Sequence, residues 1–543
     1  MWGGIPAFNP ARRLHRARQR GLQLIVIDPR RTECAKKAAI HLQCLPGFDS
    51  EIVAAMIRTI ISEKLYDAAF LDAEVDGFDD LKNAVEPFAP DAVARTAGIE
   101  ADDLVAAARM FAAAGSGNAT GGTGSNMSPN GTLLEYLLLC LNTLCGRWVK
   151  AGEPVRNLGV LFRMYSGHAR AEKPRPGYGF GEQLRVRDLQ DTAAGLPTAA
   201  LPDEILTPGP GQVKALFVVG GNPLAAFPNR AKVEKALESL ELLVVVDPHL
   251  SATAQHADYV FGPKFGFETP AISFANEGMV TYGLSIGFQE PYAQYQPALI
   301  DPPEESQVVE DWRVFYEIAR RMDLLLNYRG TAYDMQNPPT TDELIAAFVR
   351  RSPVPLEEIK SYTGGHIFEH RSEPAVPKEP DWPHRLQIGH ADMMPELTRL
   401  ADGLSANATV DADDALDLLL VSRREHEVYN SVGHSLPALQ RKRPFNPVYL
   451  NPDDAEKLNL GDADRVAIES AGRSVIGLVQ LEDAVRPGVV SVCHGFPNHS
   501  GMNELGKFAG TSVSALIDDE VQYDRFSGMP RMSAIPVRVT ASP

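Results

Sequence analysis

Two glycine pairs, each followed further along the chain by an aspartate, are the residues whose types and spacing could do chemistry. The first copy begins at Gly3-Gly4-Ile5-Pro6 and the second at Gly220-Gly221-Asn222-Pro223. Downstream of each, an apolar run ends in Asp-Pro, at Asp28-Pro29 and at Asp247-Pro248. Glycines let backbone amides approach a pyrophosphate, and an acidic residue at the next strand end can reach a ribose or base. The pattern therefore predicts two nucleotide-binding modules.

The two copies stay in register beyond the aspartates. An alanine follows each aspartate at the same distance, Ala35 or Ala254, and hydroxyl residues precede it: Thr32 in the first copy, Ser251 and Thr253 in the second. Neither copy has the full G-x-G-x-x-G fingerprint, and a single Gly-Gly pair would be weak evidence because glycine and proline mark turns everywhere. Two copies in register favour nucleotide binding over chance turns.

Short apolar strands and helices are predicted to position these residues. A helix at 10–21 precedes a strand at 22–27, further helices are predicted at 50–63, 101–114 and 133–144, and strands at 213–219 and 244–246. Beyond position 411, short strands separated by turns predict a barrel or sandwich, at 416–421, 447–450, 465–470, 474–480 and 489–493, with a small helix at 453–458. We expect an α/β fold of two Rossmann-like doubly wound modules related by an internal repeat, plus a C-terminal β-barrel.

The predicted boundaries follow shifts in composition. They are a first module at 1–152, a Pro/Gly-rich connection at 153–211, a second module at 212–350, a connector at 351–410 and the barrel at 411–543.

Composition excludes several classes of function. The chain has 543 residues and a formal net charge of −18, which argues against nucleic acid as the main partner. Its apolar runs are too short to cross a bilayer, and no secretory signal is visible, so we expect a cytoplasmic protein without membrane insertion. The five scattered cysteines favour reduced thiols, form no iron–sulfur motif, and include Cys34 and Cys44 as expected buried packing residues.

The ordered motifs resemble those of molybdopterin oxidoreductases of the dimethyl sulfoxide reductase and formate dehydrogenase type. The matching segments are Ile25–Thr32 with Leu45–Asp49, Val219–Pro223 with Ser251–Val260, and, in the last region, Ser422-Arg423, Asn430-Ser431, Asn451–Ala455, Leu460–Asp462, Arg486–Val490 and His494-Gly495. The resemblance covers nearly the whole chain. It implies a double-psi-like barrel at 411–543 and two molybdopterin guanine dinucleotides that hold Mo or W.

The resemblance also implies the residues at each site. Gly3, Gly4, Pro6, Asp28, Arg30, Thr32, Gly47 and Asp49 would hold one nucleotide, and Gly220, Gly221, Asn222, Pro223, Asp247 and Thr253 the other. Gly122 and Gly124 match a G-x-G that touches cofactor in relatives, with a flexible interhelical loop as the alternative, and Asp49 could instead be a helix N-cap. Arg423, Asn430, Ser431, His434 and His494 would bind pterin or phosphate, or be turn or surface residues. No catalytic residue or protein metal ligand is predicted.

Some positions depart from the family pattern. Ala39 stands where the first copy usually has aspartate, and Ser512–Ser514 where many relatives have an asparagine pair. The run typical of formate dehydrogenases is missing around Arg156–Gly159, which disfavours formate as substrate. No strand precedes the first glycine pair, and relatives carry an upstream region with the iron–sulfur cysteines and the metal's protein ligand. We therefore expect an iron–sulfur cluster only in such a region or in a partner, and at best weak activity from this chain alone.

Three classes of function are compatible with these residues. The first is an oxidoreductase catalytic subunit with a small-molecule substrate and an iron–sulfur or other electron-transfer partner. The second is a non-catalytic scaffold of a redox complex that kept the fold and lost the metal. The third, a nicotinamide-dependent dehydrogenase, is weakened by the incomplete glycine fingerprint and the unexplained barrel. Retention of both Asp-Pro modules and of the barrel motifs favours the first class.

Overall fold

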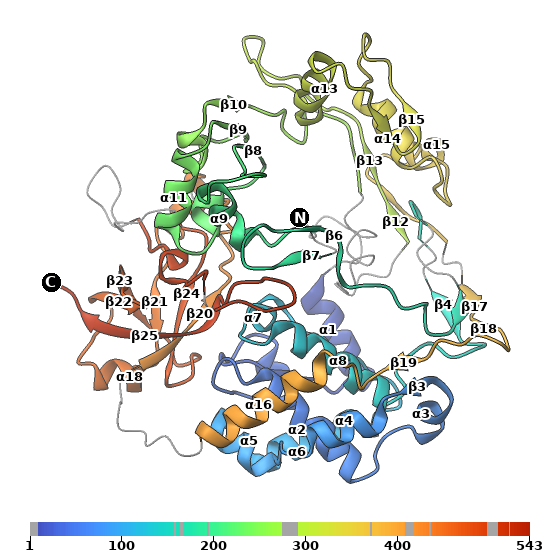
Figure 1. Ribbon diagram of the computed structural model, residues 1–543, viewed down its shortest axis with the longest axis vertical. Coiled ribbons are helices and arrows are strands. Elements are labelled where there is room, and N and C mark those ends of the chain that lie inside the picture. The colour runs from blue at the N-terminus through green and yellow to red at the C-terminus, as the bar shows by residue number, and fades with distance from the viewer. Residues whose placement is uncertain are drawn as a thin grey trace.

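The computed structural model describes residues 9–156, 159–162, 167–192, 195–273, 291–369, 372–407, 417–433, 436–496, 509–520 and 522–543. Over these ranges the chain is mixed α/β and contains a closed six-stranded barrel. Figure 1 shows the first module in blue, the second in green, an outer arm in yellow, and the barrel in orange and red. The barrel lies beside both modules, so it can contribute to a site in each.

The first module is mainly helical. Its central helix α2 (Asp49–Ser62) is buried along most of its length because its residues are apolar on nearly every face. It packs against α5 (Pro90–Ala97), α6 (Ala101–Ala113) and α8 (Gly131–Leu144), as predicted for 50–63, 101–114 and 133–144. The module also contains α1 (Pro10–Gln19), α3 (Ala68–Glu74), β3 (Val75–Asp76), α4 (Phe78–Val85) and α7 (Thr123–Asn126).

Helix α16 (Met393–Asn407) completes this core from far along the chain. It contacts α4, α5 and α8, and its Leu397 is fully buried in the same apolar cluster as Ile52. Figure 1 shows this orange helix lying across the blue helices. Part of the predicted 351–410 connector is therefore a structural element of the first module.

Each Asp-Pro segment begins at the end of a short parallel sheet. In the first module β1 (Ile25–Ile27) pairs with β2 (Ile40–Leu42). In the second, β9 (Leu242–Val246) lies between β8 (Ala215–Val219) and β10 (Tyr259–Phe261), next to α10 (Pro223–Ala226) and α11 (Arg230–Glu238). The predicted strands are confirmed. Within the described ranges, however, these sheets have two and three strands, so the extended doubly wound sheets that we expected are not shown.

The Pro/Gly-rich connection and the later connector pair with each other. Strands β4 (Pro154–Arg156) and β5 (His168–Ala169) pair with β17 (Ser372–Pro374) and β18 (Val376–Pro377). Between the connections, the outer arm holds α13 (Asp311–Arg321), the hairpin β14 (Asn327–Tyr328) and β15 (Thr331–Ala332), α14 (Thr341–Phe348) and α15 (Leu356–Lys360). The remaining short elements are β6 (Tyr178–Gln183), β7 (Gln190–Thr192), α9 (Leu201–Leu206), β11 (Ala271–Ile272), β12 (Tyr292–Ala293), β13 (Tyr295–Gln296), β16 (His366–Ile367) and β19 (Leu386–Gln387).

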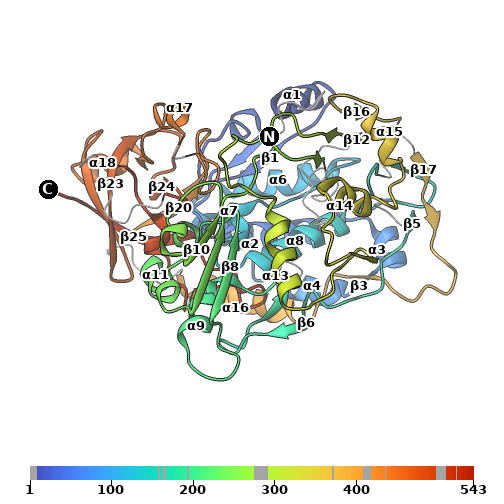
Figure 2. The same ribbon diagram turned by 90° about the horizontal axis from the view of Figure 1, so that it is seen from above.

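The C-terminal barrel closes in the strand order β20-β24-β21-β23-β22-β25. The strands are β20 (Asp417–Arg423), β21 (Val448–Leu450), β22 (Arg465–Ser470), β23 (Arg473–Leu481), β24 (Val489–Cys493) and β25 (Ser533–Ala541), with helices α17 (Pro437–Gln440) and α18 (Pro452–Lys457) between them. Alternating apolar residues of β22, β23 and β25 fill the barrel interior, as a period of two requires. Strand β25 was not predicted. Figure 2 shows the barrel at one end of the molecule, with the second module lying over its junction with the first.

In the described part of the chain, no helix combines the length and apolar character needed to cross a bilayer.

Candidate functional site

The two Asp-Pro loops form the same turn. The carboxylate Oδ1 of Asp28 accepts a hydrogen bond from the amide of Arg30 at 2.8 Å, and Oδ1 of Asp247 accepts one from the amide of His249 at 2.8 Å. Such Asx turns are set by local sequence. Each turn leaves the second carboxylate oxygen outside the turn's own hydrogen bond, which gives both loops an acceptor for a ligand.

The hydroxyl residues of the two loops also correspond. Thr32 Oγ1 accepts from the amide of Ala35 at 3.2 Å, and Ser251 Oγ accepts from the amide of Ala254 at 3.3 Å. The structural counterpart of Thr32 is therefore Ser251, whereas the sequence analysis assigned Thr253 to the second site. The internal repeat extends to individual hydrogen bonds.

The other hydroxyl residue of the second loop, Thr253, contacts the glycine turn. It is fully buried, donates through Oγ1 to Asn222 Oδ1 at 2.8 Å, and accepts from the amide of Leu224 at 3.1 Å. Asn222 Oδ1 also accepts from the amide of Thr253 at 3.2 Å. Thr253 and Asn222 thus hold the Gly-Gly-Asn-Pro turn in shape, and the assignment of Thr253 to the second nucleotide stays a prediction.

The glycine turn itself is open to solvent. Gly220 has φ +58°, a region that favours glycine, and a Cβ added there would meet no atom within 4 Å. Its amide donates to the carbonyl of Val246 at the end of β9, at 2.9 Å. Gly221 is half-buried, and Pro223 begins α10. The matching residues Gly3, Gly4 and Pro6, and the barrel residue His434, lie outside the described residues.

A barrel loop at 482–488 packs against the first Asp-Pro loop. The amide of Arg31 donates to the carbonyl of Ala484 at 2.7 Å, and the amide of Arg486 donates to the carbonyl of Pro29 at 3.1 Å. Gln43 Nε2 donates to both carbonyls, at 3.2 Å to Pro29 and 3.3 Å to Ala484. The first loop is therefore built jointly by the first module and the barrel.

A second barrel loop, at 512–520, packs against the second module. Asn229 donates its amide to the carbonyl of Ser514 at 3.0 Å and its side-chain amide to Asp519 at 2.8 Å. Asp519, whose side chain is 1% exposed, also accepts from Lys232 and Arg187, each at 2.9 Å. Burial alone would raise the pKa of Asp519, but these hydrogen bonds outweigh it and hold the pKa below its usual value. We call Asp519, Lys232, Arg187 and Asn229 the Asp519 cluster.

Gly47 and Asp49 approach the first loop from α2. Gly47 has φ +94°, and a Cβ there would lie 3.0 Å from the Cβ of Ala534 in the barrel. Asp49 is the first helical residue, and its side chain does not cap the helix, whose N-cap is Phe48. The pKa of Asp49 is raised to about 6, mainly by burial and also by the charge of Asp28. Asp28 and Asp49 are thus close enough to share one electrostatic environment.

The glycine-rich segment forms an ordered turn into α7. Gly122 and Gly124 are exposed, and a Cβ added at either would meet no atom within 4 Å. Asn126 Oδ1 is buried and has no hydrogen-bond partner in the described ranges. Two amides of the barrel, those of Met532 and Ser533, donate to the carbonyl of the adjacent Met127 at 2.9 and 3.2 Å. The turn is therefore fixed against the barrel, next to an unused acceptor.

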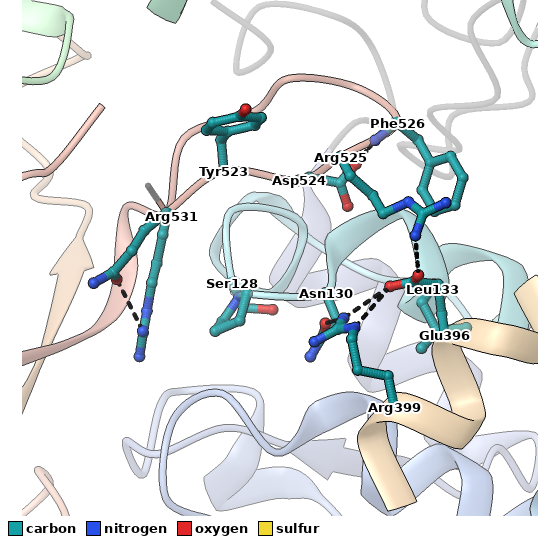
Figure 3. A pocket seen from close by; sticks show the side chains of 12 residues that line it. Ser128, Asn130, Leu133, Glu396, Arg399, Tyr523, Asp524, Arg525, Phe526 and Arg531 are labelled. Atoms are coloured by element: carbon teal, nitrogen blue, oxygen red, sulfur yellow. Dashed lines mark hydrogen bonds and ion pairs between the residues drawn. The ribbon is translucent and has the colours of Figure 1, made fainter. Parts of the chain in front are cut away.

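A polar cavity of about 310 Å³ lies between this segment, α16 and the barrel segment 522–531 (Figure 3). Glu396 is buried and pairs with Arg399 and Arg525, each at 2.8 Å, and Arg399 also donates to Asn130 Oδ1 at 2.7 Å. Arg531 lines the opposite side, and burial lowers its pKa. The sequence analysis identified none of these residues, because no local motif joins segments so far apart.

Arg423 makes ion pairs and a ring contact within the barrel. It pairs with Glu482 and Glu425, and its guanidinium stacks 3.7 Å from the centre of the Tyr449 ring. Tyr449 in turn donates to Glu425 at 2.8 Å. The role in pterin or phosphate binding that the resemblance implied for Arg423 stays a prediction, and its guanidinium here contacts Glu482, Glu425 and Tyr449.

Two other barrel candidates lie together. Asn430 is exposed, has φ +55°, accepts a hydrogen bond from Arg424, and lies 3.4 Å from His494 Nε2. Ser431 follows it in the same turn and is half-buried. Asn430, Ser431 and His494 therefore remain candidates for cofactor contact.

The cysteines divide by exposure. Cys44 is buried, and burial raises its pKa well above the usual value, whereas Cys34 is exposed, so our expectation of a buried Cys34 is wrong. No group of three or more His, Cys, Asp or Glu side chains suited to a metal ion occurs in the described part of the chain.

Comparisons with known proteins match these features. Residues 6–321 match the family model described as molybdopterin oxidoreductase, and residues 418–536 match the molydopterin dinucleotide binding domain. Formate dehydrogenase subunit alpha of Methanocaldococcus jannaschii is 30% identical over 93% of this chain and 73% of its own length. Acetylene hydratase of Syntrophotalea acetylenica is 25% identical over 97% of this chain and 74% of its own length. A solved acetylene hydratase from Pelobacter acetylenicus superposes with a TM-score of 0.72 at 21% identity, over 98% of this chain and 76% of that one.

Proposed function

Because the chain belongs to the molybdopterin oxidoreductase family, we propose that each of its Asp-Pro loops holds the guanosine end of one molybdopterin guanine dinucleotide. The protein is a molybdopterin-dependent oxidoreductase that uses this cofactor with Mo or W. The proposal concerns which residues bind which part of the cofactor, and how the barrel completes both sites.

The hydrogen-bond repeat between the two loops carries the proposal. Asp28 and Asp247 make the same turn, at the same point after a parallel strand, with one carboxylate oxygen engaged by the loop itself. Guanine presents two adjacent N–H donors, and a carboxylate is the acceptor best suited to them because charge-assisted hydrogen bonds are the stronger ones. Two matching acceptors suit two matching nucleotides.

The remaining contacts support a proposal for the phosphates and the pterins. The exposed Gly220 turn allows a phosphate to approach the backbone, as glycines at a strand-to-helix turn do. Asn430 and His494 at the barrel turn, and the buried Asn126 oxygen, supply polar groups for the pterin ends. These donors and acceptors fit a polar, anionic cofactor. When bound, the group supplies two-electron transfer at Mo or W.

The chain's own residues would orient the cofactor and exclude water. Barrel loops 482–488 and 512–520 cover the two modules, so each nucleotide would lie between a module and the barrel. Such enclosure fixes the position of the reactive centre and strengthens electrostatic contacts there. We propose that the two modules are Rossmann-like dinucleotide-binding halves and the barrel is of the double-psi type, with the boundaries given in the sequence analysis.

The proposal includes a small-molecule substrate and an electron-transfer subunit as partner, because the relative from M. jannaschii is named as a subunit. A cytoplasmic location suits the five free cysteines. The relatives are named for formate and for acetylene, so the expectation that formate is disfavoured here stays a prediction.

Cofactor analysis of purified protein tests the proposal. We expect two guanine nucleotides per Mo or W after extraction, together with pterin fluorescence. Asp28→Asn and Asp247→Asn should each lose one guanine, because an amide nitrogen cannot accept a guanine N–H. Glu33→Gln removes one negative charge from an exposed side chain of the first loop, as Asp28→Asn removes one from a half-buried side chain. This control variant should retain both guanine nucleotides. If both aspartate variants keep two guanines, the loops do not hold the nucleotides.

A further inference from the structure

An aromatic cavity of about 510 Å³ lies in the outer arm, between α13, the β14–β15 hairpin and α14. This arm is the yellow region of Figure 1. Six aromatic side chains line the cavity: Trp312, Phe315, Tyr316, Tyr328, Tyr333 and Phe348. The other lining residues are aliphatic or uncharged polar ones. The cofactor sites described above use none of these residues.

The walls of this cavity are held by satisfied polar groups. Trp312 Nε1 donates to Thr341 Oγ1 at 3.0 Å, which joins α13 to the start of α14. The buried Tyr316 donates its hydroxyl to the carbonyl of Asp334 at 2.6 Å, which joins α13 to the segment after the hairpin. The Trp312 and Tyr316 rings meet edge-to-face, 6.2 Å apart. The cavity therefore has fixed aromatic walls.

Tyr333 provides one unused hydrogen-bonding group in this apolar setting. Its hydroxyl is buried and has no partner in the described ranges, although buried polar groups are almost always hydrogen-bonded. Burial raises the pKa of Tyr333, so the hydroxyl stays protonated at neutral pH and acts as a donor. A bound molecule with an acceptor would satisfy it.

The lining defines the chemistry of that molecule. The lining residues carry no charge, which excludes an ionic ligand because burying an unpaired charge is costly. Ring faces favour a flat aromatic molecule, since aromatic pairs stack or meet edge-to-face. An apolar cavity of about 150 Å³ already holds benzene, so this one has room for two or three rings.

We propose that the outer-arm cavity binds a neutral, planar aromatic compound of two or three rings whose carbonyl oxygen accepts a hydrogen bond from Tyr333. The site is independent of the cofactor sites, so either assignment can fail without the other. The binding energy comes mainly from the apolar ring system, and Tyr333 selects for the carbonyl.

Calorimetric titration of the full chain with a matched pair of compounds tests this proposal. The two compounds are 2-acetylnaphthalene, which has a carbonyl, and 2-ethylnaphthalene, which has the same shape without one. The wild-type chain should bind both and prefer the first by about threefold to tenfold, the usual worth of one net hydrogen bond. Tyr333→Phe should bind both equally.

Two further variants control the experiment. Tyr316→Phe also removes a hydroxyl from the lining, but that hydroxyl already donates to the carbonyl of Asp334. The preference for the carbonyl compound should therefore remain in this variant. Leu344→Trp adds bulk from α14 and should abolish binding of both compounds. If Leu344→Trp loses its wild-type circular dichroism spectrum, the comparison of Tyr333→Phe with Tyr316→Phe still decides the matter.

Two outcomes would overturn the proposal. The wild-type chain could bind neither compound, or Tyr333→Phe could keep the wild-type preference. If the chain binds neither compound and forms a dimer that Leu344→Trp dissociates, the cavity is assigned to a second copy of the chain.

Discussion

Replacing Asp519 by asparagine should loosen the contact between the barrel and the second module. The carboxylate lies between Lys232 and Arg187, each 2.9 Å away, and is almost completely buried. Removing one partner of a buried ion pair costs about 3–5 kcal/mol. Both cations also reach Asp203, so each keeps a partner, and we expect about 2–3 kcal/mol.

Hydrogen exchange followed by mass spectrometry measures this effect locally, which suits a chain with several modules better than one global unfolding transition. Peptides that contain Asn229 and the start of α11 should exchange about 30- to 100-fold faster in the Asp519→Asn variant, since about 1.4 kcal/mol corresponds to a factor of ten. Peptides from α2 should be unchanged.

Glu520→Gln is the matched control. Glu520 contacts the same lysine at 2.9 Å, but its side chain is 63% exposed, so its ion pair is worth little. Equal exchange rates in the two variants would refute the argument that burial of Asp519 makes this contact strong. Because the pKa of Asp519 is lowered in the folded protein, its stabilising contribution is complete above the unfolded value of about 3.9 and is lost as the pH falls below it.

Three other substitutions test particular contacts. Burial raises the pKa of Glu51 to about 8, so the folded protein loses stability as the pH rises from about 4.5 to 8. The Glu51→Gln variant should therefore unfold at a higher temperature than wild type above pH 8. Calorimetry across this pH range measures the difference. An unchanged pH profile would contradict this assignment. Thr253→Val removes the hydroxyl that holds the glycine turn and should release guanine from the second site while the first site retains it, as measured by cofactor extraction. Loss from both sites or from neither would count against this role. Gly47→Ala should destabilise the chain by about 1–2 kcal/mol more than Gly21→Ala in urea unfolding, because both residues have a positive φ but only Gly47 faces the barrel. Equal losses would show that backbone strain alone accounts for the effect.

The parts of the fold that sequence predicted correctly depend on local interactions. The Asp-Pro turns are fixed by hydrogen bonds between residues two positions apart, and strands such as β24 are fixed by continuous apolar runs. The repeated order of such residues was enough to predict both loops. Which of Ser251 and Thr253 corresponds to Thr32 could not be predicted, because both are hydroxyl residues within the same short loop.

The parts that sequence reasoning missed depend on contacts between distant segments. Helix α16 belongs to the first module only because its apolar face meets α4, α5 and α8, far away in the chain. Arg423 follows a family motif, but Glu482 and Tyr449 occupy its guanidinium. The cavity of Figure 3 joins three segments, so no local pattern could indicate it.

The position of the barrel in the chain has a consequence for the order of assembly. Its loop at 482–488 contacts the first module, and β25, which closes the barrel by pairing with both β20 and β22, follows both modules in the sequence. Translation proceeds at about 5–20 residues per second, so the first Asp-Pro loop emerges tens of seconds before the barrel can close. During that interval the loop lacks its hydrogen bonds with Ala484 and Arg486. The first loop therefore reaches its final form only after the barrel has been made.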